Sequence, residues 1–223
     1  MFNFVKTIDF VEPNVVQENG VRWYKFGNQD KYYPSVTSVT GIRSKKSIAE
    51  WRKRVGEEEA NKVSARATSR GTAFHLLAEK YLKGTITEKD KDHPLAYYMF
   101  SSAKDALDKI DNIYCLETPL YSDYLGLAGR VDCIAEFDGE LAVIDFKTST
   151  KPKEEKWIEN YFVQETAYAA MFLERTGLEV KKIVTLVAVE EGSIQIFQKY
   201  NIDDYLQLLK CYIEEFTRSQ TNE

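Results

Sequence analysis

The chain has 223 residues and a formal net charge of −5, with 43% hydrophobic and 29% charged residues. This composition fits a single globular domain and argues against coating of nucleic acid by bulk positive charge. The 3 cysteines have no CxxC spacing, so neither a disulfide framework nor an iron–sulfur cluster is expected. No apolar run reaches the ~18 residues that a membrane span needs, so we expect no membrane partner.

Residues 1–42 are predicted to form a β-hairpin followed by a Ser/Thr-rich loop. The hairpin spans residues 21–34, with its turn around Gly27. Residues 43–111 are predicted to be a helical subdomain. Its first helical stretch runs from about 47 to 82, is interrupted near 69–71 and is capped by Gly84. Its second helix begins near Pro94 and continues to about 110.

Residues 43–70 contain nine basic and four acidic side chains, an excess of +5 in a chain whose total is −5. This stretch is either an ordinary solvated helix surface or an electropositive wall for a phosphate backbone. Arginines that could contact the backbone are Arg43, Arg52, Arg66 and Arg70. Trp23, Tyr33 and Trp51 could stack on bases, although core packing is the commoner fate of such residues.

Residues 112–217 are predicted to form an α/β core, followed by a frayed polar tail at 218–223. Three consecutive strands are expected at 112–122, 126–137 and 141–148. A helix at 157–176, capped by Gly177, precedes a hairpin of 181–190 with 193–200 and an amphipathic helix at 202–217. This order indicates a mixed central sheet flanked by helices, with an N-terminal helical layer.

The strongest chemical signal is Asp132 in one expected strand and Asp145-Phe146-Lys147 at the end of the next. Side chains at i and i+2 of a strand share a face, so Asp145 and Lys147 project together, and Asp132 can meet them across the hairpin. Carboxylates of this kind bind Mg²⁺ or Mn²⁺, which can polarise a phosphodiester. The alternative is a strand-end ion pair between Asp145 and Lys147 with no catalytic role.

Four further residues are candidates for the same site. His75 lies on the apolar stripe of its helix, so it is either a core histidine or a nitrogen ligand. Gln164 and Tyr168 are four apart on one helix face and either pack in the core or orient catalytic groups. Glu117, in the first of the three strands, is either a metal ligand or an edge-strand carboxylate.

Together these segments resemble the PD-(D/E)XK nuclease superfamily in its RecB-like exonuclease branch. The resemblance rests on Gly71-Thr72-Ala73-Phe74-His75, Gly129-Arg130-Val131-Asp132, Asp145-Phe146-Lys147-Thr148-Ser149 and Gln164-Glu165-Thr166-Ala167-Tyr168. A closer similarity, to the mitochondrial genome maintenance exonucleases and their phage and bacterial relatives, adds Tyr33-Pro34-Ser35-Val36-Thr37-Ser38-Val39 and Trp51-Arg52-Lys53-Arg54. It covers roughly residues 33–170.

The resemblance implies a PD-(D/E)XK core and a Mg²⁺- or Mn²⁺-dependent exonuclease acting on single-stranded DNA. By that likeness His75, Asp132, Asp145 and the Phe146 carbonyl would bind metal, with Glu117 as a further candidate, and Lys147 would be the catalytic lysine. The N-terminal helices would arch over the strand. Expected DNA contacts are Ser35, Thr37, Ser38, Arg43, Arg52, Arg66, Arg70, Arg130, Thr148, Ser149 and Lys151.

Two other functions remain open from the sequence. One is a structure-specific endonuclease on the same fold, and the other is a non-catalytic DNA-binding module for recombination. The intact acid–acid–lysine set favours catalysis, because clustered charges are costly to keep in a retired site. The start of the chain has neither a signal-peptide nor a transit-peptide pattern, so we expect a cytoplasmic protein of phage or bacterial origin.

Overall fold

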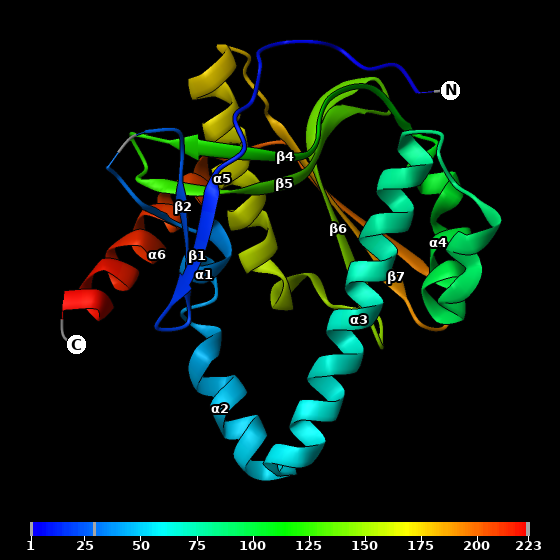
Figure 1. The fold of residues 1–223 in the computed structure, drawn as a ribbon, viewed down its shortest axis with the longest axis horizontal. Helices are drawn as coiled ribbons and strands as arrows, with labels where there is room; N and C mark the ends of the chain where they lie inside the picture. The colour runs from blue at the N-terminus through cyan, green and yellow to red at the C-terminus, as the bar shows by residue number, and fades with distance from the viewer. Residues whose placement is uncertain (1, 29, 222–223) are drawn as a thin grey trace.

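The computed structural model describes residues 2–28 and 30–221, which form two sheets and the helices around them (Figure 1). A small antiparallel sheet joins β1 (Asn14–Glu18), β2 (Val21–Lys25) and β3 (Tyr33–Pro34). The central sheet has the order β4-β5-β6-β7-β8. Its strands are Ile110–Ser122, Leu127–Phe137, Glu140–Ser149, Lys182–Val189 and Ile194–Lys199. Only β6 and β7 run parallel, so the sheet is mixed.

Helices cover both faces of the central sheet, as the sequence predicts for this fold class. One face packs against α1 (Val36–Thr40), α5 (Glu159–Thr176) and α6 (Asp203–Thr221). The other packs against α3 (Glu57–Leu82) and α4 (Pro94–Leu107). The remaining helical segments are α2 (Ser44–Val55) and the 3₁₀ turns η1 (Glu88–Asp92) and η2 (Glu155–Trp157). None of the described helices is long and apolar enough to cross a bilayer.

The alternation of side chains along β6 determines which face receives the charged residues. Ile144 and Phe146 pack in the core cluster beneath α3 and α4. Val143 packs in the opposite cluster, beneath α5. Asp145 and Lys147 follow the parity of Val143, so both project from the α5 face of the sheet, as their spacing predicts.

The central sheet separates at the strand segment that carries these charges. The β5–β6 ladder ends at the pair Cys133–Ile144, while β6 continues along β7 as far as Ser149–Val189. From Asp132 back to Leu127, the only neighbour of β5 within the central sheet is β4, and Ala128 also forms a bridge with Ser35. Strands β5 and β6 therefore diverge (Figure 1), and the register places Asp132 and Asp145 immediately past their last pair.

The helices α2 and α3 form a V-shaped projection from the molecule (Figure 1). No residue of α2 is buried, and the two helices meet at Gly56, whose φ of 89° is a backbone conformation that favours glycine. The predicted interruption near 69–71 is wrong, because α3 runs unbroken through Gly71. A glycine inside a helix costs only about 1 kcal/mol, which the packing of α3 against the core outweighs.

Three other sequence predictions need correction. The predicted Ser/Thr-rich loop contains the short helix α1, because the Ser35 hydroxyl accepts a hydrogen bond from the Ser38 amide (3.0 Å) and caps it. The expected hairpin of 21–34 gains the extra strand β1. The predicted tail is helical to Thr221, and residues 222–223 lie outside the described residues.

Candidate active site

Asp132 lies at the point where β5 leaves β6, and its carboxylate links the two strands. Its Oδ2 accepts a hydrogen bond from the Phe146 amide (2.8 Å), replacing a backbone partner where the ladder has ended. Its Oδ1 lies 3.6 Å from Nδ1 of His75, on α3. Phe146 therefore contributes its N–H to the cluster, and the metal-binding role expected for its carbonyl stays a prediction.

A group able to hold a metal ion is formed by His75, Glu117 and Asp132. One ligand atom from each residue lies within 4.8 Å of the others. Glu117 faces Asp132 across the β4–β5 pair and has a positive φ of 49°. Because a non-glycine residue in this region of the backbone map is strained, such conformations often mark functional positions. The sequence gives no sign of this conformation.

The two carboxylates change the acid–base behaviour of His75. Burial by itself disfavours the imidazolium form, but the charge of Asp132 and the nearby Glu117 outweigh burial and raise the pKa of His75 to about 9. The cluster thus attracts positive charge strongly. A divalent cation fits this donor set, since two carboxylates and one imidazole are ordinary ligands of such ions.

Asp145 and Lys147 form an ion pair beside this group. Lys147 Nζ contacts Asp145 Oδ2, and the Asp145 side chain is only 3% exposed. Burial raises the pKa of the Asp145 carboxyl, while Lys147 opposes that shift. Burial also disfavours the charged form of Lys147, but Asp145 and Asp132 together raise its pKa, so the ammonium keeps its proton.

Helix α5 contacts this ion pair through the side chain of Gln164. Gln164 Nε2 donates to Asp145 Oδ1 (3.1 Å), which agrees with the orienting role considered for Gln164. Behind it, the fully buried Glu165 accepts a hydrogen bond from the Thr185 hydroxyl. Burial and the charge of Asp145 raise the pKa of Glu165 well above its usual value. Neither Glu165 nor Thr185 has a role that is expected from the sequence. Thr185 comes close to the site because it lies opposite Asp145 in the β6–β7 register.

Tyr168, one turn beyond Gln164, explains the glycine in the Gly129–Asp132 segment. A Cβ added at Gly129 would lie 2.6 Å from the Tyr168 hydroxyl oxygen and 2.9 Å from its Cε1. Tyr168 is buried, so its ring has little room to move. The tyrosine thus packs on the bare backbone of β5 three residues before Asp132, and this contact fixes the strand that carries Asp132.

We expect Gly129→Ala to lower the free energy of unfolding by about 1–3 kcal/mol, because the new methyl group overpacks the site. The melting temperature should fall by about 2–4 °C for each kcal/mol. Tyr168→Phe removes the hydroxyl oxygen that lies nearest to the added methyl group. The free energy of unfolding of the double variant Gly129→Ala/Tyr168→Phe should therefore fall by less than the sum of the decreases in the two single variants. Gly71→Ala is the matched control, since its Cβ would lie an ordinary 3.7 Å from Thr148 Oγ1. An unchanged melting temperature for Gly129→Ala would contradict this packing argument.

The hydroxyl groups predicted to contact DNA mostly have protein partners. Ser35 and Ser38 bond to each other (2.8 Å), and Ser38 Oγ accepts from the Arg22 amide. Thr37 Oγ1 lies 3.1 Å from Ser35 Oγ. After Lys147, Thr148 Oγ1 accepts from Arg70 (3.1 Å), and the Ser149 hydroxyl donates to the Lys151 carbonyl (2.6 Å). These hydroxyls organise loops close to the candidate site, and their contact with DNA stays a prediction.

The five arginines predicted to bind DNA are each paired with a carboxylate. The pairs are Arg43–Glu215, Arg52–Glu57, Arg66–Glu190, Arg70–Glu190 and Arg130–Glu12. The side chain of Arg70 is only 6% exposed. Exposed cations of α2 with no ion pair in the described part of the chain are Lys45, Lys46, Lys53 and Arg54. The positive charge offered to solvent by the projection thus comes chiefly from α2.

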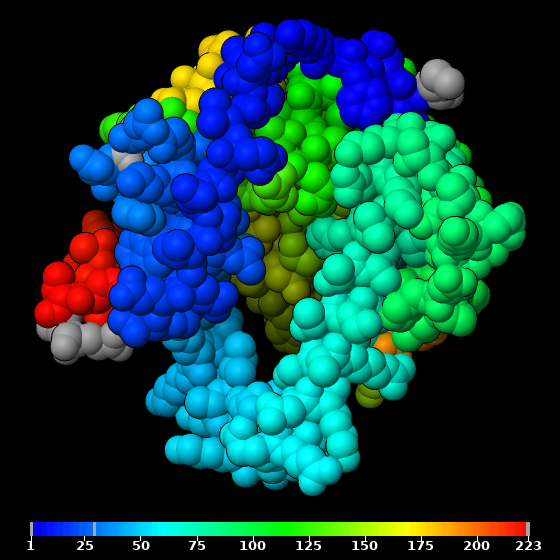
Figure 2. Space-filling model, viewed as in Figure 1, coloured from blue at the N-terminus to red at the C-terminus, as the bar shows by residue number. Residues whose placement is uncertain are grey.

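The molecular surface is hollowed between the small N-terminal sheet and α3 (Figure 2). The projection of α2 and α3 closes this hollow on one side, and its floor has the colour of the segment from β6 to α5 (Figure 2). Because His75 belongs to α3, and Asp145 and Gln164 belong to that segment, the candidate active site is built from the elements that border the hollow.

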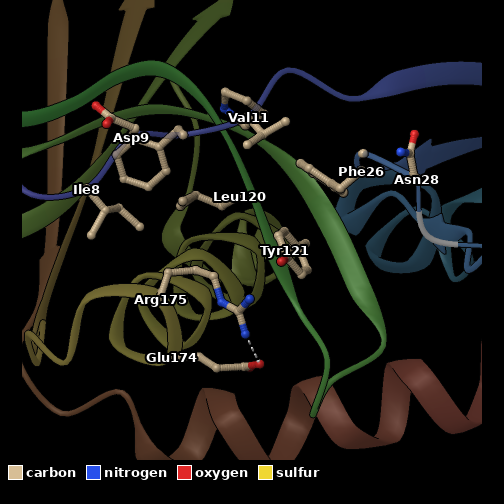
Figure 3. A pocket seen from close by; sticks show the side chains of 12 residues that line it. Ile8, Asp9, Val11, Phe26, Asn28, Leu120, Tyr121, Glu174 and Arg175 are labelled. Carbon is tan, nitrogen blue, oxygen red and sulfur yellow. Dashed lines mark hydrogen bonds and ion pairs between the residues drawn. The ribbon is translucent and has the colours of Figure 1, made fainter.

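A separate cavity of about 600 Å³ lies under residues 8–11 and beside β4 (Figure 3). Its labelled side chains include Tyr121 and the ion pair of Arg175 with Glu174 (2.6 Å) (Figure 3). None of its lining residues is one of the predicted site residues. The cavity is therefore distinct from the acidic cluster.

The segment that carries most of the charged cluster is similar to a known family of nucleases. A sequence model of the PD-(D/E)XK nuclease superfamily matches residues 108–217, a segment that contains Glu117, Asp132, Asp145, Lys147 and Gln164. Residues 108–217, which form the central sheet, the helix α5 and most of the helix α6, are thus similar to PD-(D/E)XK nuclease domains. His75 lies outside the matched segment and is brought to it by the fold.

Curated relatives include the mitochondrial genome maintenance exonuclease 1 of Homo sapiens and of Mus musculus. The human protein is 29% identical over 74% of this chain and 52% of its own length. The mouse protein is 31% identical over 84% of this chain and 61% of its own length. The chain thus spans about half to three-fifths of these relatives. Both relatives are animal proteins, and they give no support to the expected phage or bacterial origin.

A solved structure from Eubacterium rectale shows a weaker likeness. It is 13% identical, covers 67% of this chain and 65% of its own, and has a TM-score of 0.48. The structure of SSO0001 is 17% identical over 81% of this chain and 74% of its own, with a TM-score of 0.42. Likenesses of this strength add nothing to the assignment.

Proposed function

We propose that the chain is a metal-dependent deoxyribonuclease that hydrolyses single-stranded DNA from its ends. The observation that carries the proposal is the buried Asp145–Lys147 pair beside the His75–Glu117–Asp132 group. Removing so many charges from water is costly, and a purely structural role could be filled by apolar residues of similar size. Phosphodiester hydrolysis needs both a cation site and a fixed positive charge.

His75, Glu117 and Asp132 would hold Mg²⁺ or Mn²⁺, with Asp145 beside them. A divalent ion bound there would polarise a phosphoryl oxygen and lower the pKa of a bound water molecule. Phe146 N–H fixes the Asp132 carboxylate, and Gln164 fixes that of Asp145, so each oxygen keeps its direction when a substrate enters.

Lys147 would stabilise negative charge on the reacting phosphate. Its raised pKa keeps the ammonium protonated at neutral pH, which favours charge stabilisation over proton abstraction. Tyr161 places its ring 5.0 Å from Lys147 Nζ, so the lysine is held between an aromatic face and Asp145.

The preference for single strands would come from the projection of α2 and α3 beside the hollow. Its exposed lysines can follow a phosphate backbone, and the hollow borders the candidate site (Figure 2). Both relatives are named as exonucleases, which agrees with action from the ends of a strand.

Cleavage of end-labelled linear single-stranded DNA tests the proposal, with Mg²⁺, with Mn²⁺ and with EDTA. We expect metal-dependent shortening that Asp145→Asn abolishes, while Gly71→Ala cuts normally. A circular single strand should remain intact, and its cutting would replace the exonuclease assignment with an endonuclease. DNA binding without cleavage under either metal would instead support a non-catalytic module.

A further inference from the structure

The segment that follows Lys147 forms a groove with an exposed tryptophan beside it. The groove has a volume of about 330 Å³ and is lined by Lys151, Lys153 and Trp157. Trp157 is 59% exposed, although tryptophan is among the most apolar side chains. Its neighbour Ile158 is 1% exposed and anchors the segment in the core, so Trp157 is presented outward from a fixed backbone.

The loop that carries the two lysines is held rigid from three directions. Gln195 on β8 accepts from the Lys153 amide (2.7 Å) and donates to the Lys153 carbonyl (2.9 Å). Arg70 donates to Thr150 Oγ1 (3.1 Å). The Ser149 hydroxyl donates to the Lys151 carbonyl (2.6 Å). A ligand that binds here would therefore meet a preorganised loop and lose little free energy in ordering it.

The charge of this groove is positive because its nearby carboxylates are already neutralised. Glu154 pairs with Lys156, Glu155 with Lys199, and Glu190 with Arg70. Lys151 and Lys153 have no ion pair within residues 2–28 and 30–221. Lys156 Nζ also lies 5.6 Å from the centre of the Trp157 ring. An exposed aromatic ring in the same groove as the unpaired ammonium groups of Lys151 and Lys153 is a combination that binds a base together with its phosphates.

The groove adjoins the candidate active site through both segments that border it. Lys151 follows Lys147 by four residues, which span at most about 14 Å of extended chain. On the other side, Trp157 precedes the first turn of α5, whose Tyr161 ring lies 5.0 Å from Lys147 Nζ. A strand whose phosphate reaches Lys147 can thus extend along the groove.

We propose that this groove is a nucleotide subsite, in which Trp157 stacks on a base of the single strand and Lys151 and Lys153 bind the phosphates next to it. The subsite rests on the proposed nuclease function and deepens it. Trp157 acts as a positioning residue, because it holds the strand beside Lys147 without touching the reacting phosphate.

Fluorescence of Trp157 tests the subsite independently of catalysis. In a Trp23→Phe/Trp51→Phe background Trp157 is the sole tryptophan, since the chain has 3. A short oligothymidylate in EDTA should quench its emission, whereas an abasic oligonucleotide of equal length should not.

In steady-state cleavage, Trp157→Ala should raise KM by about 5–150-fold with little change in kcat, and Trp157→Phe should retain most of the affinity. Tyr124→Ala is the matched control, because Tyr124 is 84% exposed and belongs to the distant β4–β5 turn.

The lysines give a second, separate readout. Lys151→Gln and Lys153→Gln should each reduce the slope of log affinity against log salt by about 0.7. Quenching without cleavage would support the subsite and overturn only the nuclease assignment. Normal cleavage by Trp157→Ala with an unchanged KM would overturn the subsite and leave the nuclease assignment standing.

Discussion

Replacing Lys147 with methionine should lower the rate of DNA cleavage by about 10²–10³-fold or more, because methionine fills a similar volume without a charge to stabilise the reacting phosphate. Folding should also be affected. Asp145, whose side chain is 3% exposed, would lose its ion pair and keep the hydrogen bond from Gln164, and breaking a buried pair costs about 3–5 kcal/mol. Single-turnover cleavage and thermal unfolding of the same preparation measure the two effects.

The double variant Asp145→Asn/Lys147→Met separates catalysis from stability. Asparagine keeps an acceptor for Gln164 and removes the unpaired charge, so much of the lost stability should return while cleavage stays absent. Recovery of cleavage together with stability would show that Lys147 acts only as a structural partner. A Lys147→Met enzyme that cuts at the normal rate would exclude it from the active site.

Replacing Arg70 with alanine should lower the free energy of unfolding by about 3 kcal/mol. Arg70 joins α3 to the end of β6, since it donates to Thr148 and Thr150 and pairs with Glu190. The expected cost lies at the low end of that for buried pairs, because Arg66 still faces Glu190 (3.1 Å). The melting temperature should fall by roughly 6–12 °C. Cleavage should also decline, because α3 carries His75.

Arg66→Ala is the control for Arg70→Ala, because Arg66 is 67% exposed and surface pairs contribute at most about 1 kcal/mol. Adding Glu190→Gln to Arg70→Ala should recover part of the stability by removing the unpaired carboxylate. Equal effects of Arg66→Ala and Arg70→Ala would mean that Arg70 does not anchor α3. A stable Arg70→Ala protein with weakened DNA binding would instead show that Arg70 contacts the DNA backbone, as the sequence suggested.

Most of the central sheet was predictable because its strands have clear patterns and short turns. The strands predicted at 112–122, 126–137 and 141–148 match β4, β5 and β6 to within two residues.

The N-terminal region was harder to predict. Hydroxyls at alternate positions suggested a loop, yet Ser35 caps a helix with the same hydroxyl. Gly71 suggested a break, yet the turn between α2 and α3 falls at Gly56, whose positive φ no local pattern distinguishes.

The sequence by itself determined which residues carry the charges of the site. Period-two alternation places Asp145 and Lys147 on one face, and the four-residue spacing places Gln164 and Tyr168 on one side of their helix. Only the tertiary structure decided which groups meet. The divergence of β5 from β6 frees the Phe146 amide for Asp132, the fold brings His75 from a distant helix, and Glu117 turns toward them through a strained backbone. Tertiary contacts also pair four of the five predicted DNA-binding arginines with carboxylates that are more than 100 residues away in the sequence, because the partner of a charge depends on distance in space.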